Sequence, residues 1–130
     1  MSARKKHSQT AAVVLTERAL SDLREIERFS IKEWGRKTAD KYLDAIAAAL
    51  YRLKQDPAIL SLEPGFAPGL FFYRVRKHFL VCDFDGQLIS VLTILHTSMD
   101  LPTRLAELEP QLIAEAQFLH DKLRKRSKSD

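Results

Sequence analysis

The sequence has little cysteine and glycine, and it has no long apolar run. Its single cysteine, Cys82, excludes an internal disulfide, and no apolar stretch approaches the roughly 18 residues that a membrane span requires. The first ten residues lack the apolar segment of a secretory signal, so we expect a cytoplasmic protein with no membrane partner. The four glycines form no phosphate-binding loop, and the four histidines are widely separated. We therefore expect neither a metal ion nor a cofactor.

The chain has 130 residues, enough for one ordinary domain, and its basic residues gather at the two ends. Residues 1–6 and 122–130 hold eight of the 21 basic residues and one acid, a net charge of +7. The remaining residues, 7–121, carry 13 basic and 16 acidic side chains, a net charge of −3. Basic ends on a mildly acidic body are typical of solubilising tails rather than of a dedicated nucleic-acid surface. We expect a flexible basic N-terminus over 1–10 and a basic tail over 125–130.

The first half of the chain predicts a strand followed by two helices. The apolar run 11–15 favours a buried strand, and Thr16 is suited to cap a helix that ends at Gly35. A second apolar stripe at helical spacing follows almost at once and stops at Asp56-Pro57. So short a connection predicts an antiparallel helical hairpin. Residues 57–69 contain three prolines and two glycines, which indicates a loop.

After this loop the apolar period changes to that of strands. Residues 70–76, 79–84 and 88–95 read as strands, with turns at Lys77-His78 and Asp85-Gly86. The last strand is apolar at nearly every position, so we expect it to lie inside the sheet and to be covered on both faces. The predicted fold is therefore α+β, in the order β-α-α-β-β-β, with the helical hairpin on one face of a small antiparallel sheet.

A leucine stripe predicts one more helix over 105–124, with Pro110 in its first turn. We expect a core domain over 11–104 with this helix as a C-terminal extension. An exposed leucine stripe would make the protein associate with itself, so the default expectation is that the helix packs back on the domain. Docking on a target and mediating oligomers are the two alternatives.

Two polar groups are the candidates for chemistry. The first is a basic cluster, Arg74, Arg76, Lys77 and His78, in which the two arginines would leave the same face of one strand. It could grip phosphates, or its charges could protect an edge strand from aggregation. The second group follows the last strand, where His96 could transfer protons or could hydrogen-bond a turn. Cys82, Trp34 and Tyr42 are most simply core residues.

Several short motifs, taken together, resemble those of the RelE/ParE toxins of bacterial type II toxin–antitoxin systems. Across residues 12–104 they are Asp22-Leu23-x-x-Ile26, Trp34-Gly35, Ala39-x-x-Tyr42, Asp56-Pro57, Tyr73-Arg74-Val75, His78-Phe79-Leu80-Val81 and Ile94-Leu95-His96-x-x-Met99-Asp100. The resemblance implies the fold predicted above. It also implies a cognate ParD-like antitoxin that neutralises the toxin in a hetero-oligomeric complex.

The family holds two activities, and the resemblance implies different roles for the same residues. RelE-like members cut messenger RNA on the ribosome with basic side chains and, typically, a tyrosine or histidine near the C-terminus. That alternative would use Arg74, His78 and His96 as an endonuclease site, but no tyrosine follows the last strand here. ParE-like members bind DNA gyrase and cleave nothing themselves. Trp34-Gly35 and His96-x-x-Met99-Asp100 are closer to that branch, which implies no catalytic residues. The contact candidates are Arg74, Arg76, Lys77, His78, His96 and Asp100.

Overall fold

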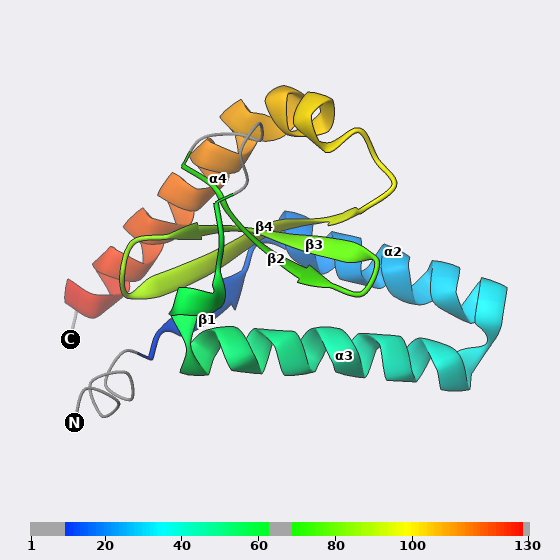
Figure 1. Cartoon of the computed structure of the whole chain (residues 1–130). Helices are drawn as coiled ribbons and strands as arrows, with labels where there is room; N and C mark the ends of the chain where they lie inside the picture. The colour runs from blue at the N-terminus through cyan, green and yellow to red at the C-terminus, as the bar shows by residue number, and fades with distance from the viewer. Residues whose placement is uncertain (1–9, 63–68, 129–130) are drawn as a thin grey trace.

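The computed structural model describes residues 10–62 and 69–128, and the side chains as far as Lys125. Three parts of the chain lie outside this range: the expected flexible segment 1–10, apart from Thr10, residues 63–68 of the proline- and glycine-containing loop, and the last two residues. The elements, shown in Figure 1, are β1 (Ala12–Leu15), α2 (Glu17–Trp34), α3 (Arg36–Gln55), the short helix η1 (Pro57–Ile59), β2 (Phe71–Val75), β3 (His78–Phe84), β4 (Leu88–His96) and α4 (Leu101–Lys128). The predicted α+β class and element order are confirmed.

The described strands form one mixed sheet in the order β1-β4-β3-β2. The antiparallel meander of β2, β3 and β4 is as predicted, but β1 pairs with β4 in parallel, with Ala12 opposite Leu88 and Leu15 opposite Val91. The expectation of a wholly antiparallel sheet was therefore wrong for β1. A parallel pair needs a long crossover between its strands, and here the helical hairpin and the first two meander strands lie in that connection.

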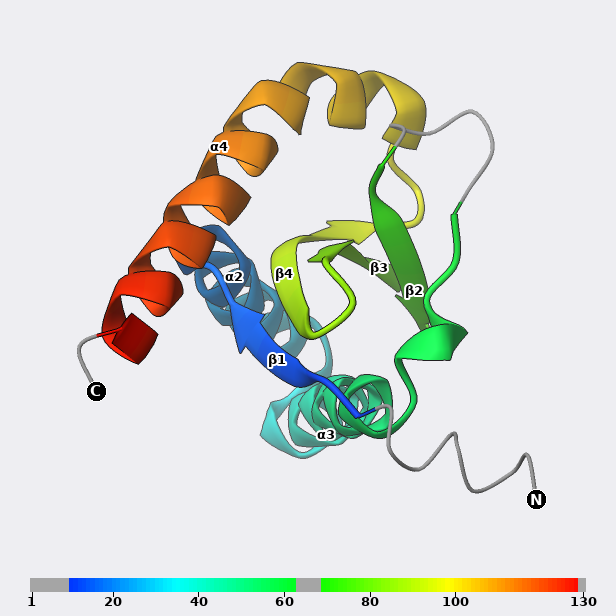
Figure 2. The ribbon, with the colours of Figure 1, turned by 90° about the vertical axis from the view of Figure 1, so that its left-hand side faces the viewer.

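The sheet is covered on both faces, which divides the core into two clusters. One lies between the sheet and the α2–α3 hairpin and includes Ile26, Ile46, Leu80 and Val91. The other lies between the sheet and α4, and Figure 2 shows the two helical layers on opposite sides of the strands. β4 is buried at Ile89–Leu95, so the prediction of an interior strand with two covered faces is confirmed.

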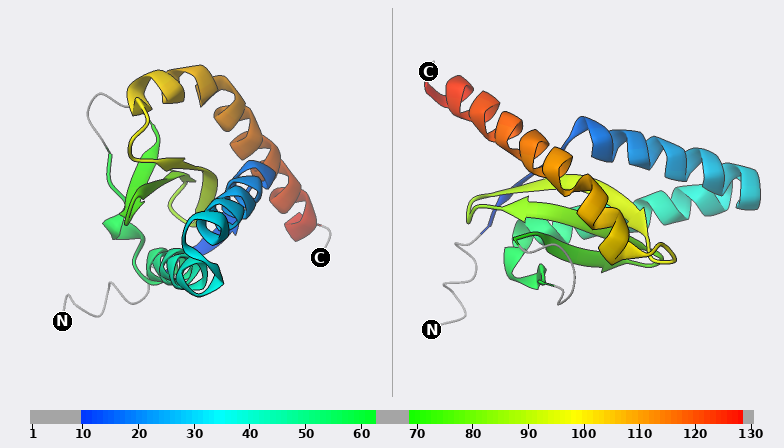
Figure 3. Two further views of the ribbon diagram at one scale, coloured as in Figure 1. Left: turned by 90° about the vertical axis from the view of Figure 1, so that its right-hand side faces the viewer. Right: turned by 90° about the horizontal axis from the view of Figure 1, so that it is seen from above.

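Local signals set the limits of the helical hairpin. The Thr16 hydroxyl accepts a hydrogen bond from the Ala19 amide, as predicted for an N-cap. Gly35 ends α2 with φ +88°, a backbone conformation that favours glycine. The tip of the hairpin projects past the sheet (Figures 1 and 3). Trp34, which we placed in the core because it continues the apolar stripe of α2, lies at this tip and is 51% exposed.

α4 begins at Leu101 and packs back on the sheet, so the default expectation for the C-terminal helix is confirmed. It is longer than predicted at both ends, and Pro110 lies inside it rather than in its first turn. Proline has no amide hydrogen for the Ala106 carbonyl, which bends a helix at this position. Figure 2 shows that α4 changes direction within its first half. The bend keeps its apolar stripe, which includes Leu105 and Leu112, on the sheet.

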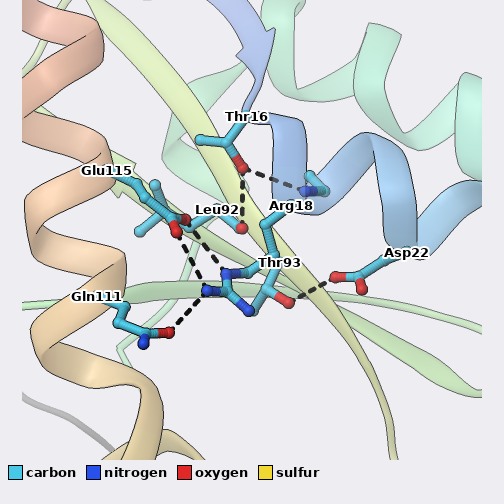
Figure 4. A network of polar contacts seen from close by, with 8 residues as sticks. Thr16, Arg18, Asp22, Leu92, Thr93, Gln111 and Glu115 are labelled. Carbon is cyan, nitrogen blue, oxygen red and sulfur yellow. Dashed lines mark hydrogen bonds and ion pairs between the residues drawn. The ribbon is translucent and has the colours of Figure 1, made fainter.

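Side chains at the start of α2 form hydrogen bonds with the part of β4 that lies beyond the end of β1 (Figure 4). The Thr16 hydroxyl donates to the Leu92 carbonyl at 3.0 Å, and the Asp22 carboxylate accepts from the Thr93 hydroxyl at 2.6 Å and the Ile94 amide at 2.9 Å. Leu92 is the extra residue of a bulge, since Val81 pairs with Thr93 and Cys82 with Val91. These side chains therefore satisfy backbone groups that β1 is too short to reach.

A second part of the same network connects α2 to α4. Arg18 donates to both carboxylate oxygens of Glu115 at 3.2 and 3.1 Å, and to the side-chain carbonyl of Gln111 at 2.8 Å (Figure 4). This forked pairing links the two helices that cover opposite faces of the sheet.

Candidate functional site

A pocket of about 250 Å³ opens between the α2–α3 hairpin and the ends of β3 and β4. α2 contributes five of its lining residues, and α3, the β2–β3 turn and the two strands contribute the others. They are Glu25, Ile26, Phe29, Ser30, Trp34, Tyr42, Lys77, His78 and His96. Three of the predicted contact candidates, Lys77, His78 and His96, therefore line one pocket.

The sheet register places the two histidines side by side. His78 begins β3 and His96 ends β4, and they are directly paired across the strands. Their ring centroids are 5.0 Å apart with the rings nearly perpendicular. Burial together with the charge of His96 lowers the pKa of His78 from 6.5 to about 4, so this ring is neutral at physiological pH.

Tyr42 of α3 holds the ring of His78. Its hydroxyl oxygen accepts from the Lys77 amide at 3.2 Å and lies 2.5 Å from Nδ1 of His78. Which of the two groups donates in this bond depends on the tautomer of the neutral His78 ring. Burial raises the pKa of Tyr42, although the Lys77 amide and the Arg76 charge oppose the shift, and the phenol stays protonated.

The His96 ring is also engaged at Nδ1. The backbone amide of Ser98 donates to it at 3.0 Å, and an amide can only donate. Nδ1 of His96 is therefore without hydrogen, and the neutral ring carries its hydrogen on Nε2. The interpretation of His96 as a residue that hydrogen-bonds a turn agrees with this contact.

The basic cluster lies beside the pocket and differs from its predicted arrangement. Arg76 was expected on a strand, but it lies in the turn with φ +53°, and the turn is Arg76-Lys77 rather than Lys77-His78 because His78 already belongs to β3. The Arg76 guanidinium lies 6.0 Å from the centroid of the Tyr42 ring. Lys77 lines the pocket. Arg74 donates from Nε to the Arg76 carbonyl at 2.8 Å.

The sheet separates Arg74 from the two histidines. Arg74 pairs with Phe79, which packs in the cluster under α4, whereas the next pair is Val75 with His78. Val75 packs in the cluster under the helical hairpin. Because successive side chains alternate between the faces of a strand, Arg74 leaves the opposite face of the sheet from His78. The three residues of the nuclease alternative do not converge on one point.

Asp100 lies outside the pocket and directly precedes α4. Its carboxylate accepts from the Thr103 hydroxyl at 2.9 Å and, at 3.5 Å, from the Thr103 amide, as in a helix cap. Cys82 is buried, as predicted, and burial raises the pKa of its thiol. Among the described residues no group of three or more histidine, cysteine, aspartate or glutamate side chains could hold a metal ion.

Sequence reasoning missed Tyr42 and Trp34 as site residues because both continue apolar helical stripes. Their exposure to the pocket depends on how far the hairpin extends beyond the sheet. The one available signal was that an aromatic residue with a polar group and an indole both lie close to the hairpin connection.

Comparison with known proteins identifies the family. Residues 13–101 match the family described as the ParE toxin of the type II toxin–antitoxin system parDE. The chain belongs to the ParE toxin family. It is 33% identical over 97 residues to the Toxin ParE of Escherichia coli, a match that spans 74% of this chain and 94% of that protein. The predicted resemblance to RelE/ParE toxins is thus confirmed, on the ParE side.

A solved structure shows the same fold. The chromosomal ParDE toxin–antitoxin system of P. aeruginosa contains a chain that superposes with a TM-score of 0.61 at 20% sequence identity. The superposition covers 99% of that chain but 69% of this one. The ParE family match ends at the first residue of α4, so nearly all of α4 lies beyond it. None of the described helices is long and apolar enough to cross a membrane.

Proposed function

We propose that this ParE family member is the toxin of a type II toxin–antitoxin pair, that it inhibits DNA gyrase by binding, and that a ParD-like antitoxin neutralises it in the cytoplasm. The observation that carries the proposal is family membership over residues 13–101. The names of both relatives support an antitoxin partner, since one is a Toxin ParE and the other is part of a ParDE system.

The chemistry of the pocket favours binding over catalysis. Cleavage of RNA at a 2′-hydroxyl needs a general base with a free lone pair and an acid that is protonated at neutral pH. Nδ1 of each histidine is engaged in a hydrogen bond, and in the neutral His96 ring Nε2 carries the hydrogen. A pKa of about 4 leaves His78 without the proton that an acid would donate. Arg74, which would stabilise the phosphate, lies on the other sheet face.

We place the gyrase contact on the turn between β2 and β3 and its surroundings. Arg76 and Lys77 are exposed there, next to the exposed aromatic rings of Phe29 and Trp34. Exposed arginine and aromatic residues are enriched at the centres of protein interfaces. This surface is bordered by Arg74, His78 and His96, whereas Asp100 caps the start of α4.

Two assays on the purified chain without antitoxin test the proposal. We expect loss of supercoiling by gyrase, with accumulation of broken DNA, and no cleavage of messenger RNA in programmed ribosomes. Cleaved message with unaffected gyrase would establish the endonuclease alternative. In that case, combined alanine substitution of Arg74, His78 and His96 should abolish cleavage.

A further inference from the structure

Two of the polar side chains that line the pocket, Lys77 and His96, supply hydrogen-bond donors. The hydrogen bond at Nδ1 leaves an Nε2–H group on the neutral His96 ring, and Lys77 adds an ammonium. Within the described residues, Nε2 of His96 has no hydrogen-bonding partner. Glu25 is the one acidic residue in the lining, and it lies 3.8 Å from Arg28. The pocket is therefore suited to a ligand that supplies acceptors.

The walls of the pocket are apolar. Ile26 forms part of them, and Phe29 and Trp34 pack edge to face with ring centroids 5.8 Å apart. Phe29 is 58% exposed and Trp34 is 51% exposed. Exposing two large apolar rings to water on one helix is unfavourable and is typical of an interaction site. A volume of about 250 Å³ is below the roughly 300–1,000 Å³ of pockets for drug-sized ligands. It is suited to one bulky side chain.

The rim of the pocket carries unpaired positive charge. Neither Arg76 nor Lys77 has an ion-pair partner among the residues that the structure describes, whereas Arg18 and Arg36 elsewhere are both paired. An acidic partner would complement the charge of this rim, and the attraction would raise its association rate.

We propose that this pocket anchors one bulky apolar side chain of an acidic antitoxin segment, whose carboxylates accept from Lys77, Arg76 and the Nε2–H group of His96. This inference rests on the proposed function and names the chemistry of the partner segment. An apolar anchor in a desolvated pocket with charged neighbours at the rim is the usual form of a binding hot spot.

A nucleic acid fits the pocket less well, although its phosphates would suit the rim. The amino groups of the bases would need acceptors, and the side-chain acceptors in the lining are Glu25 and the hydroxyls of Ser30 and Tyr42, of which Tyr42 already accepts from the Lys77 amide. The pocket borders the surface that we assign to gyrase. The antitoxin segment would therefore neutralise the toxin by direct competition at Lys77 and Trp34.

Fluorescence of the full chain tests the inference, because Trp34 is the only tryptophan in the sequence and lines the pocket. The probes are a short capped peptide with one leucine between glutamates, the same peptide with lysines in place of glutamates, and a short single-stranded RNA. We expect a saturable change with the glutamate peptide and binding at least about tenfold weaker with the lysine peptide.

Charge reversal at one exposed lysine supplies the matched control. Lys77→Glu should weaken the glutamate peptide about tenfold, whereas Lys54→Glu, at the far end of α3, should leave its affinity within about twofold. Both lysines are exposed, so the two variants are expected to fold, and their circular dichroism is to be compared with that of the parent chain.

Three results would overturn the inference: equal binding of the lysine and glutamate peptides, equal loss in the two variants, or saturable binding of the RNA alone. Gyrase supercoiling, measured on the same samples, separates the two claims. Gyrase inhibition without peptide binding would refute the anchor pocket and leave the proposed function standing. Peptide binding without gyrase inhibition would support the pocket and contradict the target.

Discussion

Lowering the pH should destabilise the fold through His78. Its pKa is about 4 in the folded chain and 6.5 in an unperturbed ring, chiefly because of burial. Below pH 6.5 the unfolded chain therefore binds more protons at this position, and stability falls until the pH has passed the folded pKa. The full difference corresponds to about 3 kcal/mol. Because the ring is partly exposed, solvent screening reduces the expected loss to roughly 1.5 kcal/mol.

His78→Gln isolates this contribution, since a glutamine amide can still form a hydrogen bond with the Tyr42 hydroxyl but does not titrate. Groups that do not interact with His78 are the same in both proteins and cancel in the comparison. Between about pH 7.5 and 4, urea unfolding should show the parent chain losing roughly 1.5 kcal/mol more than the variant, a relative midpoint shift of about 0.5–1.5 M. Identical pH dependence of the two proteins, or an NMR titration of the His78 ring near 6.5, would refute the reasoning.

Three further substitutions test the contacts around the site and under α4 by urea unfolding. Tyr42→Phe removes the hydroxyl that bonds His78 and Lys77 and should cost about 1–2 kcal/mol; an unchanged midpoint would show that these bonds add nothing. Thr16→Ala removes the α2 cap and should cost about 1–2 kcal/mol, whereas Thr16→Ser should retain most of it, and equal losses would contradict the capping role. Leu112→Ala should lower the free energy of unfolding by about 2–5 kcal/mol, whereas Ile113→Ala, at the exposed neighbouring position, should lower it by under about 0.5 kcal/mol. A smaller loss for Leu112 than for Ile113 would mean that α4 does not close the second core.

Local signals made most of the elements predictable from sequence. Thr16 and Gly35 limit α2 as their residue types require, and Asp85 accepts from the amides of Gln87 and Leu88 at the predicted hairpin. The continuous apolar run of β4 predicted its two covered faces because that pattern follows from burial alone.

Long-range geometry was less accessible to sequence reasoning. The parallel pairing of β1 with β4 joins residues about 76 apart, and nothing in the run 11–15 specifies the direction of its partner. The bond between Tyr42 and His78 spans 36 residues, so no local pattern could reveal it. Trp34 satisfies the core spacing of α2 but lies where the hairpin has passed the sheet, and periodicity carries no information on where the facing layer ends.

The measurement that tests the central claim most directly is gyrase supercoiling against increasing amounts of the purified, antitoxin-free chain, with broken DNA quantified in the same reactions. The account predicts concentration-dependent loss of supercoiling with accumulated breaks, weakened by Lys77→Glu and preserved in Lys54→Glu. Full supercoiling at every concentration of a folded chain, or equal inhibition by the two variants, would contradict it.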